Sequence, residues 1–264
     1  MKKKTAREIA DAIRTRVTGG EAQPGETLAT IADLAAEYGV ARETVRSAVA
    51  QLESEGLVRP VLRRGIVVQE RVPRRRIRRG QLVTRNPHYG YVFPATHDRM
   101  EPWQTHGSPY RSMENAPDLV SEIFNVDPGA EVLRRRRVTS PEGEPPFQIV
   151  DTWLSPAAVA DAPRIAEPST GPGGYIDRLE EAGHGPITWQ ETTRVRMPTT
   201  EEARLLNTTT TLPVFEITMV GKSGRTDEAL EVTVKVIPGD RVELVADLVR
   251  HESAAWPVEP VEAA

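Results

Sequence analysis

Two short helical patterns separated by a tight turn occupy residues 30–56, and they constrain the fold more strongly than any other feature of the sequence. The first pattern begins at Thr30, whose hydroxyl can cap a helix, and ends at Gly39, which suits a left-handed exit. The second runs from about Arg42 to Glu55. Both repeat apolar residues at helical spacing, namely Leu34, Ala35, Tyr38, Val45, Ala48, Val49 and Leu52. Two helices joined by so short a turn predict a helix-turn-helix.

The flanking segments extend this unit to residues 1–68. Apolar residues from Ile9 to Val17 recur at helical spacing and predict a helix over about 5–18. After the second helix, two short strands are predicted at 57–58 and 65–68, on either side of a basic loop at 59–64. This order of elements predicts a winged helix-turn-helix, in which the basic loop is the wing.

The exposed side of the second helix carries the residues that could read DNA. In a helix-turn-helix the N-terminal end of the second helix enters the major groove, where arginine can bond bidentately to guanine. The predicted contacts are Arg42, Glu43, Thr44 and Arg46 on this helix, with Arg63, Arg64 and Gly65 of the wing reaching a phosphate or the minor groove. In the alternative reading, these arginines only solvate a helix surface.

The charge is distributed unevenly along the chain. Residues 1–80 contain 17 Lys and Arg against 10 Asp and Glu, whereas residues 81–264 contain 17 against 28. The formal net charge of −4 therefore hides a basic N-terminal part and an acidic remainder. A basic module joined to an acidic one is typical of a DNA-binding domain with a separate second domain.

Composition narrows the remaining classes of function. The sequence has no cysteine, which excludes disulfides, thiolate catalysis and cysteine-based zinc sites. No run approaches the roughly 18 apolar residues that cross a bilayer, so we expect a cytoplasmic protein without membrane association. No cofactor and no metal site are expected. The histidines lack metal-ligand spacing and are expected on the surface or in loops, at His88, His97, His106 and His184.

An arginine-rich linker and a second domain follow the wing. Residues 69–80 contain six arginines, which predicts either a solvated, flexible segment or additional phosphate contacts. Residues 81–250 alternate short strand patterns with helical ones and predict an α+β domain on an antiparallel sheet. The predicted strands are 89–93, 131–139, 147–154, 187–197, 214–222, 230–237 and 241–249, and the helices 116–124, 157–160, 175–182 and 200–206. Residues 251–264 are expected to be a disordered tail.

Residues 5–68 resemble the winged helix-turn-helix of the GntR regulators. The motifs that carry the resemblance lie in family order at 13–20, 24–28, 34–40, 42–46, 52–58 and 64–68. The resemblance implies DNA contacts by Arg42, Thr44 and Arg46, assisted by the wing. Two departures put the operator sequence in doubt. Ala32 stands where relatives carry an arginine that contacts DNA, and Ala41 replaces the usual Ser or Thr cap of the second helix.

Residues 80–250 resemble the UTRA effector domain of the HutC branch of these regulators. The motifs include Val132-Leu133, Glu144-Pro145-Pro146, Asp151-Thr152-Trp153-Leu154, Gly173-Gly174-Tyr175-Ile176 and Pro238-Gly239-Asp240-Arg241. The resemblance implies a chorismate lyase-like fold with a ligand pocket, and dimerisation through this domain.

The same resemblance assigns the effector-binding residues. The arginine that binds phosphate or carboxylate in relatives falls on Arg137, and the acidic residue that orients a hydroxyl or amine falls on Glu231. Gly173, Gly174 and Tyr175 stand at a predicted helix start, where backbone N–H groups favour an anion. A second basic position of sugar-phosphate sensors is Thr139 here. The implied effector is an anionic small molecule, a carboxylate or a sugar phosphate.

Strand geometry leaves the role of Arg137 open. Alternation turns two of the four arginines at 134–137 to each face, and one pair is expected to form a solvated face. Glu231 could likewise be an ordinary exposed strand residue.

Together these patterns predict a dimeric repressor that binds a pseudo-palindromic operator in double-stranded DNA and is released by the effector. One alternative is a regulator with a vestigial pocket and no effector. Another is a lyase-like enzyme, but no acid/base pair or nucleophile supports it, and we expect no enzymatic activity.

Overall fold

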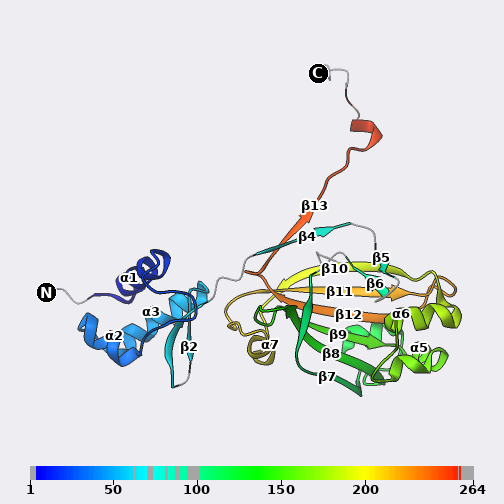
Figure 1. The fold of residues 1–264 in the computed structure, drawn as a ribbon, viewed down its shortest axis with the longest axis horizontal. Helices are drawn as coiled ribbons and strands as arrows, with labels where there is room; N and C mark the ends of the chain where they lie inside the picture. The colour runs from blue at the N-terminus through cyan, green and yellow to red at the C-terminus, as the bar shows by residue number, and fades with distance from the viewer. Residues whose placement is uncertain are drawn as a thin grey trace.

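The N-terminal unit is built from three helices and a small antiparallel sheet (Figure 1). The computed structural model describes residues 4–61, 63–69, 74–80, 83–86, 90–93, 101–254 and 256. The helices are α1 (Ala6–Thr18), α2 (Ile31–Tyr38) and α3 (Arg42–Ser54). The strands β1 (Thr27–Ala29), β2 (Val58–Val61) and β3 (Gly65–Val68) lie in the order β1-β3-β2.

Local sequence explains where these helices begin and end. Thr5 with Glu8 and Thr30 with Asp33 form capping boxes at the starts of α1 and α2. Gly39 ends α2 in the left-handed conformation, with φ 63°, which turns the chain directly into α3. The apolar stripes of the three helices meet in one core with Val58 and Ile66. The predicted helix-turn-helix and wing strands are confirmed.

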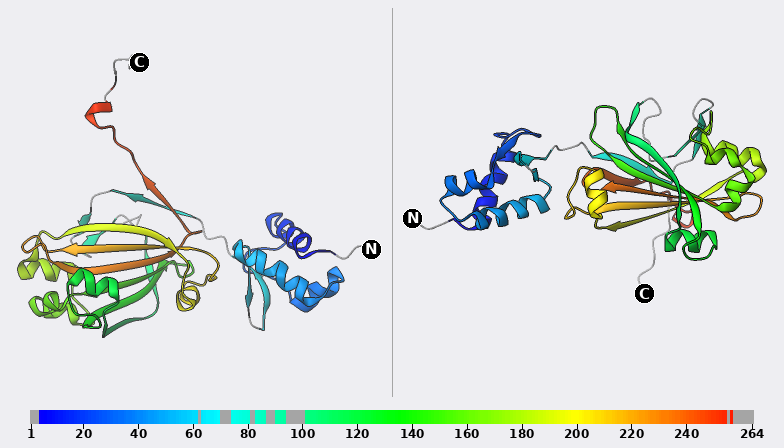
Figure 2. Two further views of the ribbon diagram at one scale, coloured as in Figure 1. Left: turned by 180° about the vertical axis from the view of Figure 1, so that it is seen from behind. Right: turned by 90° about the horizontal axis from the view of Figure 1, so that it is seen from below.

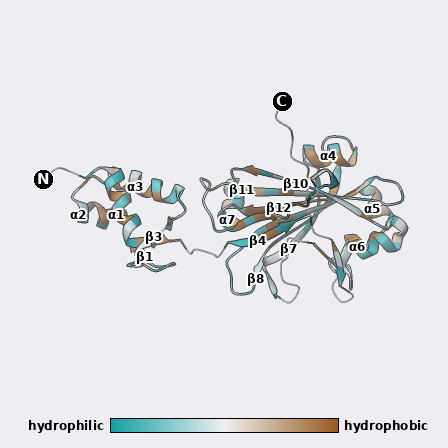
Figure 3. Cartoon of the chain, turned by 90° about the horizontal axis from the view of Figure 1, so that it is seen from above, coloured by the Kyte–Doolittle hydropathy of each residue, from teal (hydrophilic) through white to brown (hydrophobic). Residues whose placement is uncertain are grey.

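The C-terminal unit is an antiparallel sheet with the strand order β10-β11-β12-β9-β8-β7. Its strands are β7 (Trp103–Asn115), β8 (Glu131–Pro141), β9 (Gln148–Leu154), β10 (Thr188–Arg196), β11 (Val214–Lys222) and β12 (Ala229–Pro238). Figure 3 shows hydrophobic residues along β11 and β12, and every residue of β9 is buried. This confirms the predicted α+β domain.

Helices cover both faces of this sheet. On one face, α4 (Asp118–Phe124) packs on Val132, Trp153 and Val232, and α7 (Thr200–Leu205) is followed by Leu206, which packs on Val236. On the other face, a core cluster around Leu154 contains residues of α5 (Pro156–Asp161), η1 (Pro163–Ala166) and α6 (Gly174–Leu179). A π-helical segment, η2 (Glu180–His184), continues α6. We call this second face the pocket face.

Part of the arginine-rich linker is a strand. Strand β4 (Arg75–Arg79) pairs in parallel with β13 (Val242–Ala246). Its central residue, Ile77, is buried with Phe147 and Ile237 on the pocket face. The arginines of β4 alternate around this buried isoleucine and bind carboxylates, as in the pair of Arg75 with Glu101. Residues 75–79 therefore differ from the solvated segment that their composition predicts, because non-local pairing supplies the missing partners.

Further elements are formed by the chain before and after the six-stranded sheet. A hairpin of β5 (Thr84–Asn86) and β6 (Gly90–Val92) follows β4. The residues after β13 extend away from the sheet in Figure 1 and in the left view of Figure 2, and they end in the turn η3 (Glu252–Ala254). Most of the predicted tail, like His88 and His97, lies outside the described residues. In the described part, no helix is long and apolar enough to span a membrane.

Candidate nucleic-acid interface and effector pocket

The leading turns of α3 present an exposed polar face. Arg42, Glu43 and Arg46 are exposed and Thr44 is half-buried, whereas Val45 is fully buried in the core. The Nη1 atom of Arg46 lies 2.9 Å from a carboxylate oxygen of Glu43. Because both side chains are largely exposed, this ion pair contributes little to stability and leaves Arg46 able to exchange its partner.

The start of α3 lacks a side-chain cap. Ala41 occupies the N-cap position with an extended backbone, and no side chain accepts the first N–H groups of the helix. The predicted absence of this cap is therefore confirmed. The free N–H groups lie beside Arg42, so the leading end of α3 combines a positive helix dipole with a cationic side chain.

The two arginines of the wing that are predicted to contact DNA, Arg63 and Arg64, are held differently. Gly65 has φ 102°, and a side chain there would bring its Cβ to 3.0 Å from the carbonyl oxygen of Ala29, so the turn requires glycine. Arg63 is exposed. The guanidinium of Arg64 instead donates to the carbonyl oxygen of Gly25 at 2.8 Å and to the hydroxyl of Thr27 at 3.2 Å. Of the two predicted contacts, Arg63 points to solvent while Arg64 is tied to its own unit.

A cavity of about 800 Å³ opens on the pocket face of the large sheet. Its lining brings together four of the residues expected to bind an effector, Arg137, Gly173, Gly174 and Tyr175. Phe93 and Tyr91, which flank the end of β6, form another part of the wall. No acidic residue belongs to this lining in the described part of the chain, so an anionic ligand would meet no carboxylate in the wall.

Pairing across the sheet explains which arginines reach the cavity. Arg135 pairs with Thr152 and Arg137 with Val150, and their side chains share the pocket face with Lys235. Among the described residues Arg137 has no hydrogen-bond or ion-pair partner, and it is exposed. The side chain that the resemblance assigns to anion binding is thus uncompensated and open to the cavity.

The other two arginines do not form the solvated face that was expected. Arg134 and Arg136 are half-buried and both bind Asp151, at 3.0 and 2.8 Å. Arg134 also lies over the ring of Trp153, with its guanidinium carbon 5.1 Å from the ring centroid. The expectation was wrong because Asp151 on the neighbouring strand faces the same side and binds both guanidinium groups, while Arg134 also pairs with Glu114 and Arg136 with Glu201.

Glu231 lies behind the cavity wall and does not line it. Its carboxylate accepts hydrogen bonds from the hydroxyl of Tyr175, from Nε1 of Trp189 at 2.8 Å and from the hydroxyl of Thr233 at 3.1 Å. The side chain is 1% exposed, and burial raises its pKa. These bonds fix the position of the Tyr175 phenol, whose pKa is raised well above its usual value by burial and by the adjacent carboxylate.

The sequence did not identify three further arginines that line the cavity, Arg111, Arg135 and Arg136. Arg135 donates to the carbonyl oxygens of Ile165 and Glu167, both at 2.9 Å, and Arg111 donates to that of Ala166. Burial lowers the pKa of Arg135, with a further contribution from Arg111 and Arg137. Thr139, the lost second basic position, hydrogen-bonds to Gln148.

The predicted surface position of His184 is wrong. The ring is 3% exposed, with Nδ1 3.1 Å from the hydroxyl of Ser223 and Nε2 3.0 Å from a carboxylate oxygen of Asp161. The left-handed Gly183, with φ 89°, turns the chain so that the ring enters the structure. His184 therefore joins η2, α5 and the turn after β11.

Comparison with known proteins supports both units. A family model described as bacterial regulatory proteins of the gntR family matches residues 5–68, and a UTRA domain model matches residues 110–243. An uncharacterized HTH-type transcriptional regulator of Streptomyces coelicolor is 31% identical over 211 residues, which cover 76% of each chain. The mannosyl-D-glycerate transport/metabolism system repressor MngR of Escherichia coli is 28% identical over 212 residues, covering 80% of this chain and 82% of MngR.

Solved structures show the same fold over nearly the whole chain. A GntR-family regulator superposes with a TM-score of 0.57 at 22% identity, covering 93% of this chain and 98% of that chain. PhnF from Mycobacterium smegmatis gives a TM-score of 0.50 at 22% identity, covering 92% of this chain and 99% of PhnF. With the helix-turn-helix, the wing and the cavity described above, these matches show that the chain belongs to the GntR family of bacterial transcription regulators, in the UTRA-bearing branch that fits the HutC subfamily.

Proposed function

We propose that this regulator is a dimeric repressor that dissociates from its operator when a small anion occupies the cavity of its C-terminal unit. The observation that carries the proposal is the uncompensated Arg137 in a cavity whose described lining holds no carboxylate. The relative MngR is named as a repressor, which supports the same direction of control.

The DNA half of the proposal rests on α3. Its leading end would enter the major groove, with Arg42, Thr44 and Arg46 meeting base edges or phosphates and Glu43 holding Arg46 until DNA replaces it. Arg63, an exposed arginine of the wing, would reach a phosphate. Because a two-fold dimer presents two such helices, the operator would be pseudo-palindromic, with half-sites about one helical turn apart.

The effector half rests on the cavity. Arg137 would bind a carboxylate or phosphate group bidentately, and the Tyr175 hydroxyl would be held beside it by Glu231. Glu231 is thus proposed to position Tyr175 and not to contact the ligand. Gly173 and Gly174 would allow the ligand to approach the backbone closely.

The chain path connects the two halves. In the cavity wall, Tyr91 belongs to β6 of the hairpin β5–β6 and Phe93 follows it directly. In sequence this hairpin follows β4, which in turn follows the wing. A ligand that contacts these two residues would therefore act on the strand nearest the DNA-binding unit. To release DNA, it must bind more tightly to an arrangement that misplaces α3.

A two-step experiment tests the proposal. A thermal-shift screen of carboxylates and sugar phosphates identifies a binder, which at 100 times its dissociation constant should stabilise the protein by roughly 2.7 kcal/mol. The binder is then titrated into the complex of the protein with a selected operator, followed by fluorescence anisotropy. We expect release of DNA from the wild type, and no release from Arg137→Ala, which should still bind the operator.

The outcomes separate the alternatives. Release from Arg137→Ala at wild-type effector concentrations removes Arg137 from the site. A screen without any binder favours a regulator with a vestigial pocket. Chemical turnover of the binder would instead support a lyase-like enzyme.

A further inference from the structure

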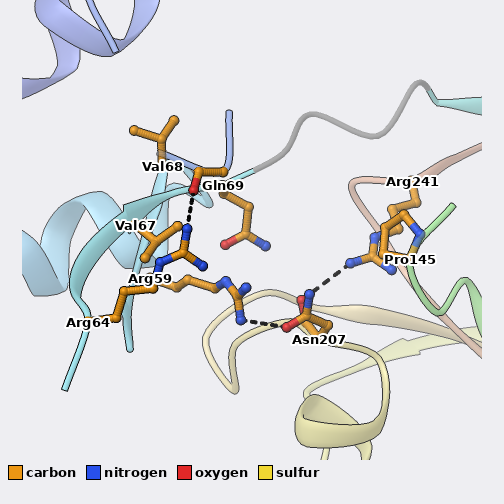
Figure 4. A pocket seen from close by; sticks show the side chains of 9 residues that line it. Arg59, Arg64, Val67, Val68, Gln69, Pro145, Asn207 and Arg241 are labelled. Atoms are coloured by element: carbon orange, nitrogen blue, oxygen red, sulfur yellow. Dashed lines mark hydrogen bonds between the residues drawn. The ribbon is translucent and has the colours of Figure 1, made fainter. Parts of the chain in front are cut away.

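A second, smaller cavity lies between the two units of the chain (Figure 4). Its volume is about 170 Å³. The DNA-binding unit contributes residues of the wing strands, Arg59 and Arg64 among them, and the C-terminal unit contributes Pro145, Asn207 and Arg241. We call it the interdomain cavity. It is separate from the cavity around Arg137, which shares none of its lining residues.

The described lining of the interdomain cavity is rich in arginine. Three arginines line it, and no aspartate or glutamate belongs to the lining in the described part of the chain. The guanidinium of Arg59 donates to Oδ1 of Asn207 at 2.5 Å, and Arg64 donates to the Gly25 carbonyl and the Thr27 hydroxyl. Arg59 and Arg64 are therefore held in place by neutral acceptors, which leave their positive charges uncompensated in the wall.

Arg241 brings a buried cation to the same cavity. Its side chain is 4% exposed and donates to the backbone carbonyl oxygens of Pro146 and Asn207. Figure 4 shows that its guanidinium faces Asn207 across the cavity from Arg59. Asn207 therefore stands between an arginine of each unit, and it adopts a left-handed backbone, with φ 52°, that Asn tolerates well.

Gln69 supplies an independent sign of a missing partner. It is 9% exposed, it lines the cavity, and its Oε1 atom has no hydrogen-bond partner among the described residues. In Figure 4 its amide points into the space between the wing strands and Asn207. Since a half-turn of the amide exchanges Oε1 and Nε2, the same side chain can present an NH₂ group to an acceptor. A buried amide without a partner is costly unless something binds it.

We propose that the interdomain cavity binds a small tetrahedral oxyanion, such as inorganic phosphate or the phosphate group of a small metabolite. Such an anion accepts hydrogen bonds from several guanidinium groups and from the Gln69 amide at once. Because the site is made from both units, an anion in it favours the arrangement in which Arg59 meets Asn207, and it thereby fixes the DNA-binding unit relative to the sheet.

Phosphate binding to the full-length protein without DNA tests this proposal. Isothermal titration calorimetry with sodium phosphate, at constant ionic strength, is performed on the wild type and on Asn207→Asp. The substitution is nearly isosteric but puts a carboxylate between the arginines, so we expect the affinity to fall by at least about tenfold. Arg204→Gln, which removes an exposed charge from α7 outside the lining, is the control that should keep the wild-type affinity at this site. Arg137→Ala is added to detect phosphate that binds in the larger cavity instead.

The results distinguish phosphate bound in the interdomain cavity from phosphate bound in the larger cavity and from a phosphate of the operator DNA. Absence of saturable phosphate binding, or binding lost only in Arg137→Ala, overturns the proposal, and the second result assigns the anion to the larger cavity. Binding of a DNA duplex that Asn207→Asp weakens, while phosphate binds neither protein, would show that an operator phosphate occupies the site and would also overturn it. If Asn207→Asp does not fold, hydrogen exchange on the wild type replaces it: phosphate must slow exchange in β2 and α7 together.

Discussion

The surroundings of Lys235 disfavour the charged form of its side chain. Its side chain is 8% exposed on β12, its Nζ atom is 3.7 Å from the sulfur of Met219, and it lies 5.6 Å from the centroid of the Phe93 ring. Burial lowers the pKa of this lysine to about 8. Arg137 and Arg79 add to this effect, so the positive potential that favours an anion in the cavity also disfavours a charged lysine beneath it.

Replacing Lys235 by methionine should stabilise the protein at pH 7. The lysine is charged in the folded and the unfolded chain below pH 8, so the full cost of its burial is present there and amounts to roughly 1–3 kcal/mol. As pH rises from about 8 towards the ordinary lysine pKa, the folded chain loses this proton first and the cost disappears. Urea unfolding should show Lys235→Met more stable at pH 7 and the difference shrinking by pH 10. A variant less stable than the wild type at pH 7 contradicts this account.

The sequence predicted how residues are oriented where local strand geometry sets the orientation. It did not predict burial that depends on partners far away in the sequence. Strand alternation correctly limited the arginines of one face to two of four, and the structure turns Arg135 and Arg137 to the cavity. The burial of Glu231 depends on Tyr175 and Trp189, which lie 56 and 42 residues away in sequence, so no local pattern could indicate it. His184 was misjudged for the same reason.

At the scale of elements, α2 and α3 differ in how they begin. The hydroxyl oxygen of Thr30 accepts from the backbone N–H of Asp33, and the Asp33 carboxylate accepts from the backbone N–H of Thr30. Ala41 gives α3 a suitable backbone, with φ −68° and ψ 147°, but no side-chain acceptor. The helix that carries the DNA contacts therefore has the weaker start.

Ala41→Ser should stabilise the N-terminal unit by about 1 kcal/mol, because the serine hydroxyl can accept an N–H group of the first turn of α3. The matched variant Thr30→Ala removes the cap of α2 and should cost a similar amount, about 1 kcal/mol. Both are measured by urea unfolding. Equal stabilities of Ala41→Ser and the wild type would show that the start of α3 is satisfied in another way.

Most helices and strands of the C-terminal unit were predictable from the sequence, but β7 and β4 were not. The strands β8 to β12 fall close to their predicted ranges, and apolar residues recur along all of them except the polar, exposed β10. β7 was missed because most of its residues are exposed and it contains Gly107 and Pro109. β4 was missed because its arginines obscure a single buried residue, Ile77. Both strands exist through their pairing partners, β8 and β13.

At the scale of the whole molecule, the two units differ in charge, and they differ in the ligand that each is proposed to bind. The basic unit at the N-terminus offers the exposed face of α3 to a polyanion. In the C-terminal unit, Arg137 has no ion-pair partner among the described residues and lines a cavity of about 800 Å³. The interdomain cavity lies between them. The central claim is that the leading end of α3 reads duplex DNA and that the C-terminal unit decides when it can do so.

Operator discrimination by variants of α3 tests this claim most directly. The measurement compares anisotropy titrations of a selected operator and of a scrambled duplex at physiological salt. Arg42→Ala and Arg46→Ala should each reduce the discrimination by about 1–3 kcal/mol per lost base contact, whereas Arg7→Ala, an exposed arginine of α1, should retain it. If both α3 variants discriminate as well as the wild type does, the leading end of α3 does not read the operator, and the claim is wrong.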